Sequence, residues 1–251
     1  MRRIAAALVV AIAAAGCSGG GDIASLADKA RAATTTDPPA QPTTTTGAVL
    51  SGEPLEIAEQ GVSSFPDPFD PGATLGGYGV VLRNPNPGVI AAGVRVVTRI
   101  LNSLGDELLV DSTLLNGVMP GQLMALGRTL IEPIADPTQL EVTVKVGAWL
   151  KPLSATGRLI ATDVITEPEA NGGAVTRFAV RSTWPESEEG VDVTAVYRAA
   201  DGRILGAEST TLPLVPPAGQ VAGQIRLLSP IPDLASTEVF VGRGLAGQTT
   251  G

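Results

Sequence analysis

The stretch GVRVVTRILNSLGDELL (residues 93–109) is matched 97 positions later by GVDVTAVYRAADGRILG (190–206). A second pair of segments, PIADPTQLEV (133–142) and PIPDLASTEV (230–239), shares the same offset. Two separated blocks with one offset indicate an internal duplication. A repeat of about 97 residues has the size of a β-sandwich domain, so each copy is long enough to bury a core of its own.

Alternation within the repeat predicts strands. In 191–198 the odd positions carry Val, Val, Ala and Tyr, while the even positions are mostly polar. A period of two turns one face of a strand inward and leaves the other facing water. The following ADG (200–202) predicts a hairpin turn, because Gly202 can adopt a positive φ.

Turn signals every 8 to 15 residues divide the rest of each copy into short strands. Between the matched blocks, VMPGQ (118–122) corresponds to VPPAGQ (215–220) with one inserted residue. The strands we predict span 54–65, 77–84, 93–101, 107–115, 122–131 and 139–150 in the first copy, and 157–165, 191–198, 203–212, 221–228 and 236–244 in the second. The short connection between the copies restricts the hinge, so we expect a modestly rigid two-domain rod.

The start of the chain has the layout of a secretory signal peptide. Arg2 and Arg3 precede an apolar run of 12 residues, 4–15, which is too short to cross a bilayer. The run ends in AAAGC, where Cys17 is the only cysteine among 251 residues. A single cysteine has no disulfide partner and cannot form a metal site by itself.

This ending resembles the lipobox of bacterial lipoproteins, with alanine at position 14 where leucine is usual. The resemblance implies cleavage before Cys17 and fatty-acyl chains, such as palmitate, attached to that residue. Two or more chains hold a protein stably on a membrane, since each buried methylene contributes about 0.8 kcal/mol. We therefore expect export and a lipid anchor on Cys17, at the outer face of the cytoplasmic membrane or within the cell envelope.

Composition separates a tether from the folded region. TTTDPPAQPTTTT (34–46) is a low-complexity segment that predicts a disordered, extended spacer. The sequence thus predicts an all-β protein with two tandem Ig-like β-sandwich domains after a signal peptide and a disordered Thr/Pro tether. The expected parts are signal peptide 1–16, lipidated cysteine and tether 17–50, domain one 51–151, domain two 157–246 and disordered tail 247–251.

The repeats resemble the FxLYD-type and related Ig-like domains of bacterial envelope proteins. The shared features are strands ending in Asn or Ser (VVLRN, 80–84; FAVRS, 178–182), a tyrosine before a turn in VTAVYRAADGRIL (193–205), and the Pro-Gly element at 118–122 and 215–220. The F-x-L-Y-D string itself is absent. The resemblance implies a β-sandwich and carries no catalytic role.

The amino-acid composition excludes several kinds of catalytic and metal site. The chain has no histidine, which removes Ser-His-Asp triads, the H-E-x-x-H zinc site and imidazole bases. Loss of Arg2 and Arg3 with the signal peptide leaves 15 basic and 25 acidic residues, a net charge of −10. Such a charge disfavours nucleic acid as a partner. No cofactor is expected.

A few residues remain as candidates. Asp67 and Asp70, in the loop FPDPFDPG (65–72), are weak candidates for Ca²⁺, which needs six to eight oxygens; a solvated loop is the plainer interpretation. Arg95 and Arg99 share one strand face and could form a patch for an anionic ligand with Arg83. Trp184, before Pro185 at a loop tip, is the best candidate for an exposed contact residue.

The leading hypothesis is a non-enzymatic, lipid-anchored envelope protein. Its tandem Ig-like domains would bind another envelope protein or act as a spacer, since such domains bind through end loops or edge strands. The alternative is an accessory subunit that presents a ligand to a transport or cell-wall machine. An enzyme using carboxylates alone is a third and weaker hypothesis. A deep pocket would favour the second hypothesis, and a flat surface with an apolar patch the first.

Overall fold

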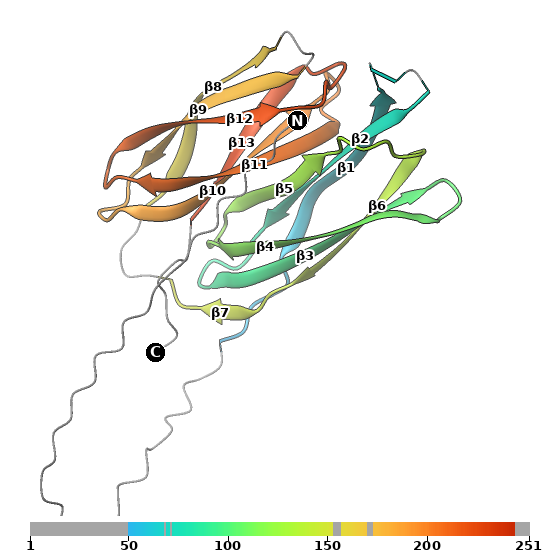
Figure 1. The fold of residues 1–251 in the computed structure, drawn as a ribbon. Helices are drawn as coiled ribbons and strands as arrows, with labels where there is room; N and C mark the ends of the chain where they lie inside the picture. Colours follow the sequence, from blue (N-terminus) through green and yellow to red (C-terminus); the bar gives the residue numbers. More distant parts are fainter. Residues whose placement is uncertain (1–49, 68, 71, 153–156, 170–172, 244–251) are drawn as a thin grey trace, which may run out of the picture. The chain divides into compact units, whose positions relative to one another are not determined.

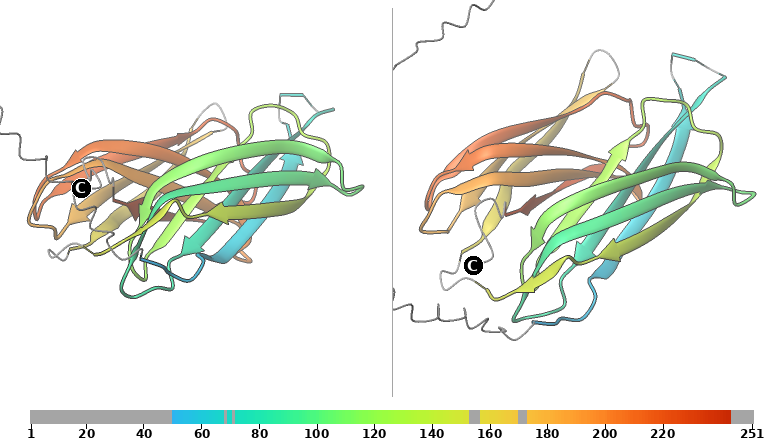
Figure 2. Two further views of the ribbon diagram at one scale, coloured as in Figure 1. Left: turned by 90° about the horizontal axis from the view of Figure 1, so that it is seen from below. Right: turned by 60° about the horizontal axis from the view of Figure 1, so that its bottom comes forward.

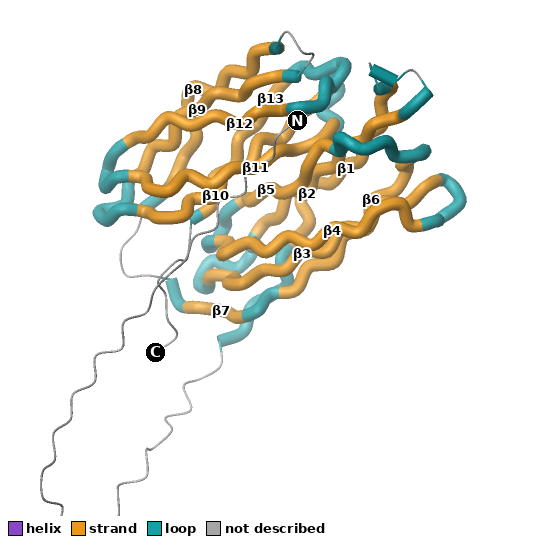
Figure 3. The backbone as a smooth tube through the Cα atoms, viewed as in Figure 1, coloured by secondary structure: helices purple, strands orange, loops and turns teal. Residues whose placement is uncertain are grey.

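The computed structural model describes residues 50–67, 69–70, 72–152, 157–169 and 173–243. The predicted signal peptide, Cys17 and almost all of the predicted tether lie outside these residues. The described residues belong to one compact unit of strands and loops (Figures 1 and 3). Within them, no helix is long and apolar enough to cross a membrane.

Thirteen strands make up the described part of the chain. They are β1 (Glu56–Pro66), β2 (Thr74–Arg83), β3 (Ile90–Asn102), β4 (Glu107–Val118), β5 (Leu123–Thr129), β6 (Pro137–Lys145), β7 (Ala148–Leu150), β8 (Leu159–Pro168), β9 (Ala174–Ser182), β10 (Glu188–Arg198), β11 (Ile204–Val215), β12 (Gln220–Leu227) and β13 (Ser236–Gly242).

The strands form four antiparallel sheets, two in each copy. The first copy contains β1-β2-β5 and β4-β3-β6, with the short β7 also paired to β3; the second contains β8-β9-β12 and β11-β10-β13. Strand order is therefore the same in both copies, which confirms the duplication. The sheets pair into two sandwiches, so the predicted all-β tandem sandwich is confirmed (Figure 1).

The two copies also share backbone geometry at equivalent positions. Four residues with positive φ in the first copy have counterparts 97 positions later, and the pairs are Gly93 and Gly190 (57° and 60°), Gly105 and Gly202 (both 86°), Gly121 and Ala218 (69° and 45°), and Asp136 and Asp233 (52° and 63°). The prediction of one inserted residue at 215–220 is wrong. The two turns align without a gap, because Gln122 donates its N–H to Met119 as Gly219 does to Pro216.

The turn at Ala218 leads to a prediction about stability. An L-residue with a side chain is strained at positive φ, and glycine is not. We expect Ala218→Gly to raise the free energy of unfolding by about 0.5–1 kcal/mol, and the equivalent Gly121→Ala to lower it by about 1 kcal/mol. Urea denaturation of the two variants measures both changes. Equal midpoints for Ala218→Gly and the parent would contradict the expectation.

The two sandwich cores follow the predicted alternation. On β3, Val94, Val96 and Ile100 point inward and are at most 1% exposed, whereas Arg95 and Arg99 are exposed. On β10 the odd positions 191–197 are buried in the same way. Apolar burial of this kind is the main favourable term in folding, at roughly 25 cal/mol per Å².

The other face of β10 differs from the expectation that it would meet water. Val196 is fully buried and Thr194 is 4% exposed, because this face packs against the first copy. Sheet β11-β10-β13 lies against sheet β1-β2-β5, and the two sandwiches stand side by side (Figure 2). A third apolar cluster fills this contact: Val81, Ala125, Val196, Ile204, Ala207 and Phe240. The expected rod is therefore wrong.

Small residues allow this contact to be close. A Cβ on Gly77 would lie 2.3 Å from the carbonyl oxygen of Leu205, and one on Gly206 would lie 2.8 Å from the Thr129 methyl group. Polar groups cross the contact as well: Ser63 donates to the Leu205 carbonyl, and Glu208 accepts the Thr129 N–H at 3.1 Å. Burial raises the pKa of the Glu208 carboxyl, an effect that its hydrogen bonds from Thr129 oppose.

Candidate functional site

The structure places Trp184 in the loop between β9 and β10, but not on the surface. Only 8% of the residue is exposed, so the expected exposed contact is wrong. The Arg243 guanidinium covers the indole, with its Cζ 4.2 Å from the ring centroid, and Gly157 packs against the ring. The indole instead forms part of the wall of a pocket.

The three arginines expected to form one patch do not come together. Arg83 ends β2 and faces Glu56 across 3.8 Å, while Arg95 and Arg99 project from β3 in the opposite sheet of the sandwich. Because Arg99 pairs with Glu107 at 3.6 Å, its charge is also partly neutralised. On β6, the cross-strand neighbour of Arg95 is Lys145. That neighbour was missed, since register between β3 and β6 is not visible in the sequence.

Asp67 and Asp70 lie in the loop that joins β1 to β2, and both carboxylates serve that loop. Asp67 accepts the N–H of Phe69 at 2.8 Å, and Asp70 accepts the N–H of Gly72 at 3.1 Å. These are Asx turns, which shape loops without a ligand. Among the described residues, no group of three or more candidate ligand side chains is close enough to hold a metal ion.

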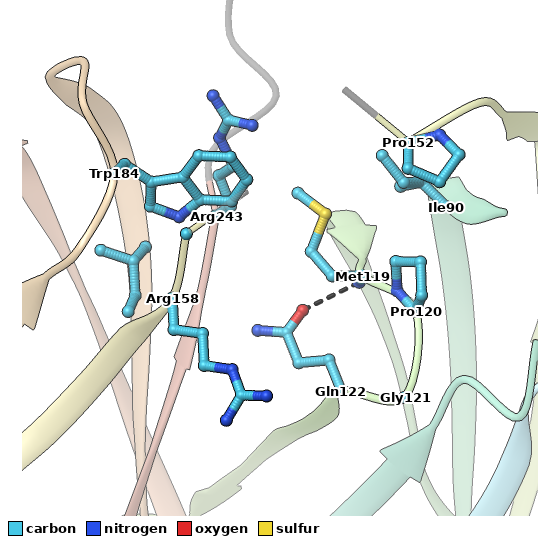
Figure 4. A pocket seen from close by; sticks show the side chains of 11 residues that line it. Ile90, Met119, Pro120, Gly121, Gln122, Pro152, Arg158, Trp184 and Arg243 are labelled. Carbon is cyan, nitrogen blue, oxygen red and sulfur yellow. Dashed lines mark hydrogen bonds between the residues drawn. The ribbon is translucent and has the colours of Figure 1, made fainter. Parts of the chain in front are cut away.

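A pocket of about 450 Å³ opens between the two sandwiches (Figure 4). We call it the inter-repeat pocket. The first copy contributes Ile90, Met119, Pro120, Gly121, Gln122 and Pro152, and the second contributes Gly157, Arg158, Leu159, Trp184 and Arg243. Neither copy forms the pocket alone, and both walls are loops at strand ends.

Hydrogen bonds hold the first-copy wall against the second copy. Gln122 donates from Nε2 to the carbonyl of Val241 at 2.7 Å, and its Oε1 accepts the N–H of Met119 at 2.8 Å. The second bond closes the β4–β5 turn in which Gly121 takes a φ of 69°. Gln122 thereby ties this turn to β13, and both polar ends of its side chain are already used.

Charge in the pocket is opposite to that of the protein. The chain has a net charge of −8, yet among the described residues the pocket is lined by two arginines and by no aspartate or glutamate. Behind the wall, Arg243 donates its Nε–H to Glu188, a residue only 2% exposed. Arg158 has no carboxylate partner among the described residues. The free positive charge of the pocket therefore comes mainly from Arg158.

One buried donor in the wall is unsatisfied. Arg243 Nη1 is buried without a hydrogen-bond partner, as is Glu188 Oε1, within the part of the chain that the structure describes. Buried polar groups are normally paired, and this donor has no exposed surface through which a pocket ligand could reach it. The Arg158 guanidinium, by contrast, is exposed in the pocket and presents N–H donors of the kind that pair with carboxylate and phosphate oxygens.

The lining combines apolar and cationic side chains. Apolar surface from Met119 and Trp184 lines the pocket together with the two arginines (Figure 4), and Leu159 adds to it. Small-molecule sites commonly combine an apolar wall with a few placed polar groups in 300–1,000 Å³. The described lining supplies such groups from two arginines.

Comparison with known proteins adds only a fold-level likeness. No known protein family and no curated protein sequence matches this chain. Two crystal structures of Parabacteroides merdae β-glucuronidase, one with glycerol in the active site, match 67% of this chain at 12% identity and a TM-score of 0.23. The match spans 27% of the enzyme chain. The likeness is too distant to carry an argument, and membership of the FxLYD type stays a prediction.

Proposed function

We propose that this protein is a non-enzymatic, lipid-anchored binding protein of the bacterial cell envelope. Its two Ig-like domains hold a small ligand in the inter-repeat pocket and present it to another envelope protein. Of the three hypotheses drawn from the sequence, this is the accessory, ligand-presenting one, and the pocket supports it. Protein binding without a ligand, or a spacer role, has less support because Trp184 is buried.

One observation carries the proposal: both copies contribute walls to one pocket of about 450 Å³. The close contact between the sandwiches and the Gln122 bridge hold these walls at a set distance. A binding site gains affinity when its walls are already in place, because less ordering is needed on binding. A spacer would need no such arrangement.

The ligand itself is the first test. We expect the full chain, purified from its native membrane in mild detergent, to carry a small molecule seen by native mass spectrometry and recovered by solvent extraction. Met119→Trp should abolish this, because the larger ring fills the pocket. Leu104→Trp is the matched control, at an exposed turn remote from the pocket. Identical extracts from the parent and Met119→Trp would contradict the proposal.

The anchor is tested independently. We expect Cys17→Ser to move the protein from the membrane fraction to the soluble envelope fraction, because the acyl chains can no longer be attached. Each buried methylene contributes about 0.8 kcal/mol, so loss of two or three chains removes nearly all membrane affinity. Fractionation and the mass of the mature N-terminal peptide measure the change. A Cys17→Ser protein that stays on the membrane contradicts the anchor.

A further inference from the structure

We infer that the ligand of the inter-repeat pocket is an amphipathic anion: one carboxylate or phosphate group bound by Arg158, joined to an apolar body. This inference rests on the proposed function, because it names the chemical class that the same pocket takes. The juxtaposition that carries it is the Arg158 guanidinium, which has no carboxylate partner within the described ranges, beside an apolar wall in an acidic protein.

Arg158 is the group that would bind the anion. It stands at the entry to β8 and its side chain extends toward the first-copy side of the pocket (Figure 4). Its backbone is held in place, since its N–H donates to the Thr183 hydroxyl at 2.8 Å. A guanidinium presents a planar fork of N–H donors that fits carboxylate and phosphate oxygens two at a time.

Arg243 has a different role in the pocket. Its Nε–H is committed to Glu188 and its guanidinium plane lies over Trp184. We assign it as a positioning residue that holds the indole in the wall. Its Nη1 is buried and unpaired among the described residues, so contact with the anion falls to the exposed Arg158.

The remaining polar lining argues against an uncharged, hydroxyl-rich ligand. Gln122 uses both its amide groups within the protein, at 2.7 and 2.8 Å. A sugar would therefore find arginine donors and few acceptors. A polar ligand loses affinity for each hydroxyl group that it leaves unpaired in a pocket.

The rest of the lining is apolar and accounts for the body of the ligand. Ile90, Met119, Pro120, Pro152, Leu159 and Trp184 surround the space. Methionine adapts to irregular apolar shapes, and an indole face offers a large flat contact. An alkyl chain or a planar ring attached to the anionic group suits this wall, and a compact hydrophilic anion does not.

Titration calorimetry of the full mature chain tests the class of ligand. The probes are monomeric dodecanoate, dodecyl phosphate and dodecyltrimethylammonium, which share one chain and differ in the head group. We expect one or both anions to bind and the cation not to bind. Preference between dodecanoate and dodecyl phosphate identifies the source as a free carboxylate or a phosphate-bearing lipid.

Arg158→Gln provides the decisive variant. We expect it to weaken anion binding by roughly 10- to 100-fold, as for a lost hydrogen bond to a charged group. Arg158→Lys should restore part of the affinity because it restores the charge. Arg181→Gln, which removes an exposed arginine on β9, is the matched control and should bind as the parent does.

The outcomes separate this inference from the function on which it rests. Equal binding of the cation and the anions, or no effect of Arg158→Gln, overturns the inference. A neutral ligand that is lost in Met119→Trp but kept in Arg158→Gln overturns the inference alone and leaves the proposed function standing. If Met119→Trp changes neither the co-purified ligand nor the binding seen by calorimetry, the inference and the proposed function are both wrong.

Discussion

Gly77→Leu is expected to lower the free energy of unfolding by about 3 kcal/mol and to destroy the inter-repeat pocket. Gly77 lies in β2 on the face that meets the second sandwich. A Cβ there would come within 2.3 Å of the Leu205 carbonyl oxygen and 3.1 Å of the Gly206 Cα. Both are backbone atoms, so no side chain can swing aside, and the sheets must separate.

Separation of the sheets has consequences beyond the glycine itself. It exposes the cluster that contains Val81, Val196 and Phe240, each of which is now at most 7% exposed. It also breaks the hydrogen bond from Ser63 to Leu205 and leaves that buried carbonyl without its hydroxyl donor. Lost apolar burial and an unpaired polar group add to the cost of overpacking.

Guanidinium chloride denaturation measures the loss, and ligand titration measures the pocket. Gly88→Leu is the matched control, because a Cβ at Gly88 meets no atom within 4 Å. We expect this control to unfold as the parent does, within about 0.5 kcal/mol. Parent-like unfolding and binding by Gly77→Leu would show that the two sandwiches do not pack as described.

Glu188→Ala is expected to cost about 3–5 kcal/mol of stability, since it leaves a buried charge without its partner. Glu188 is 2% exposed and accepts the Nε–H of Arg243, whose side chain is 12% exposed. The partnerless Arg243 also covers Trp184, so the same change should loosen the pocket wall. Arg243→Met should cost a similar amount for the converse reason.

A double-mutant cycle checks the pair. We expect Glu188→Ala combined with Arg243→Met to be less destabilised than the sum of the single variants, because no buried charge is left over. The exposed pair Glu167 and Arg177, whose side chains are both 57% exposed, is the control, and removing Glu167 should cost less than about 1 kcal/mol. Strict additivity at Glu188 and Arg243 would mean that the two charges are not coupled.

Much of the fold could be predicted because it depends on local pattern. The strand predicted at 107–115 lies within β4, and the one predicted at 236–244 contains β13. The positive φ expected at Gly202 is present and recurs at Gly105. Alternation and turn residues act over a few positions, so a sequence reveals them directly.

The candidate site could be predicted only in part. Trp184 was singled out and does line the pocket, yet its burial depends on Arg243, which lies 59 residues away in the chain. Nothing in the sequence marks Arg158 as a site residue, because an arginine just before a strand is common and its surroundings depend on the tertiary structure. The expected patch of Arg83, Arg95 and Arg99 does not form, because Arg95 and Arg99 share β3 whereas Arg83 ends β2 in the other sheet of the sandwich.

The sequence by itself determined the duplication, the strands and which strand residues face the core of each sandwich. It also determined which residues can adopt the backbone conformations of the turns. These follow from the period of apolar residues and from the steric limits of each amino acid. Only the tertiary structure decided which outer faces meet, and therefore where the pocket lies. Two small, flat β surfaces such as those at Gly77 and Gly206 carry no local mark of their partner, because complementarity is a property of both surfaces together.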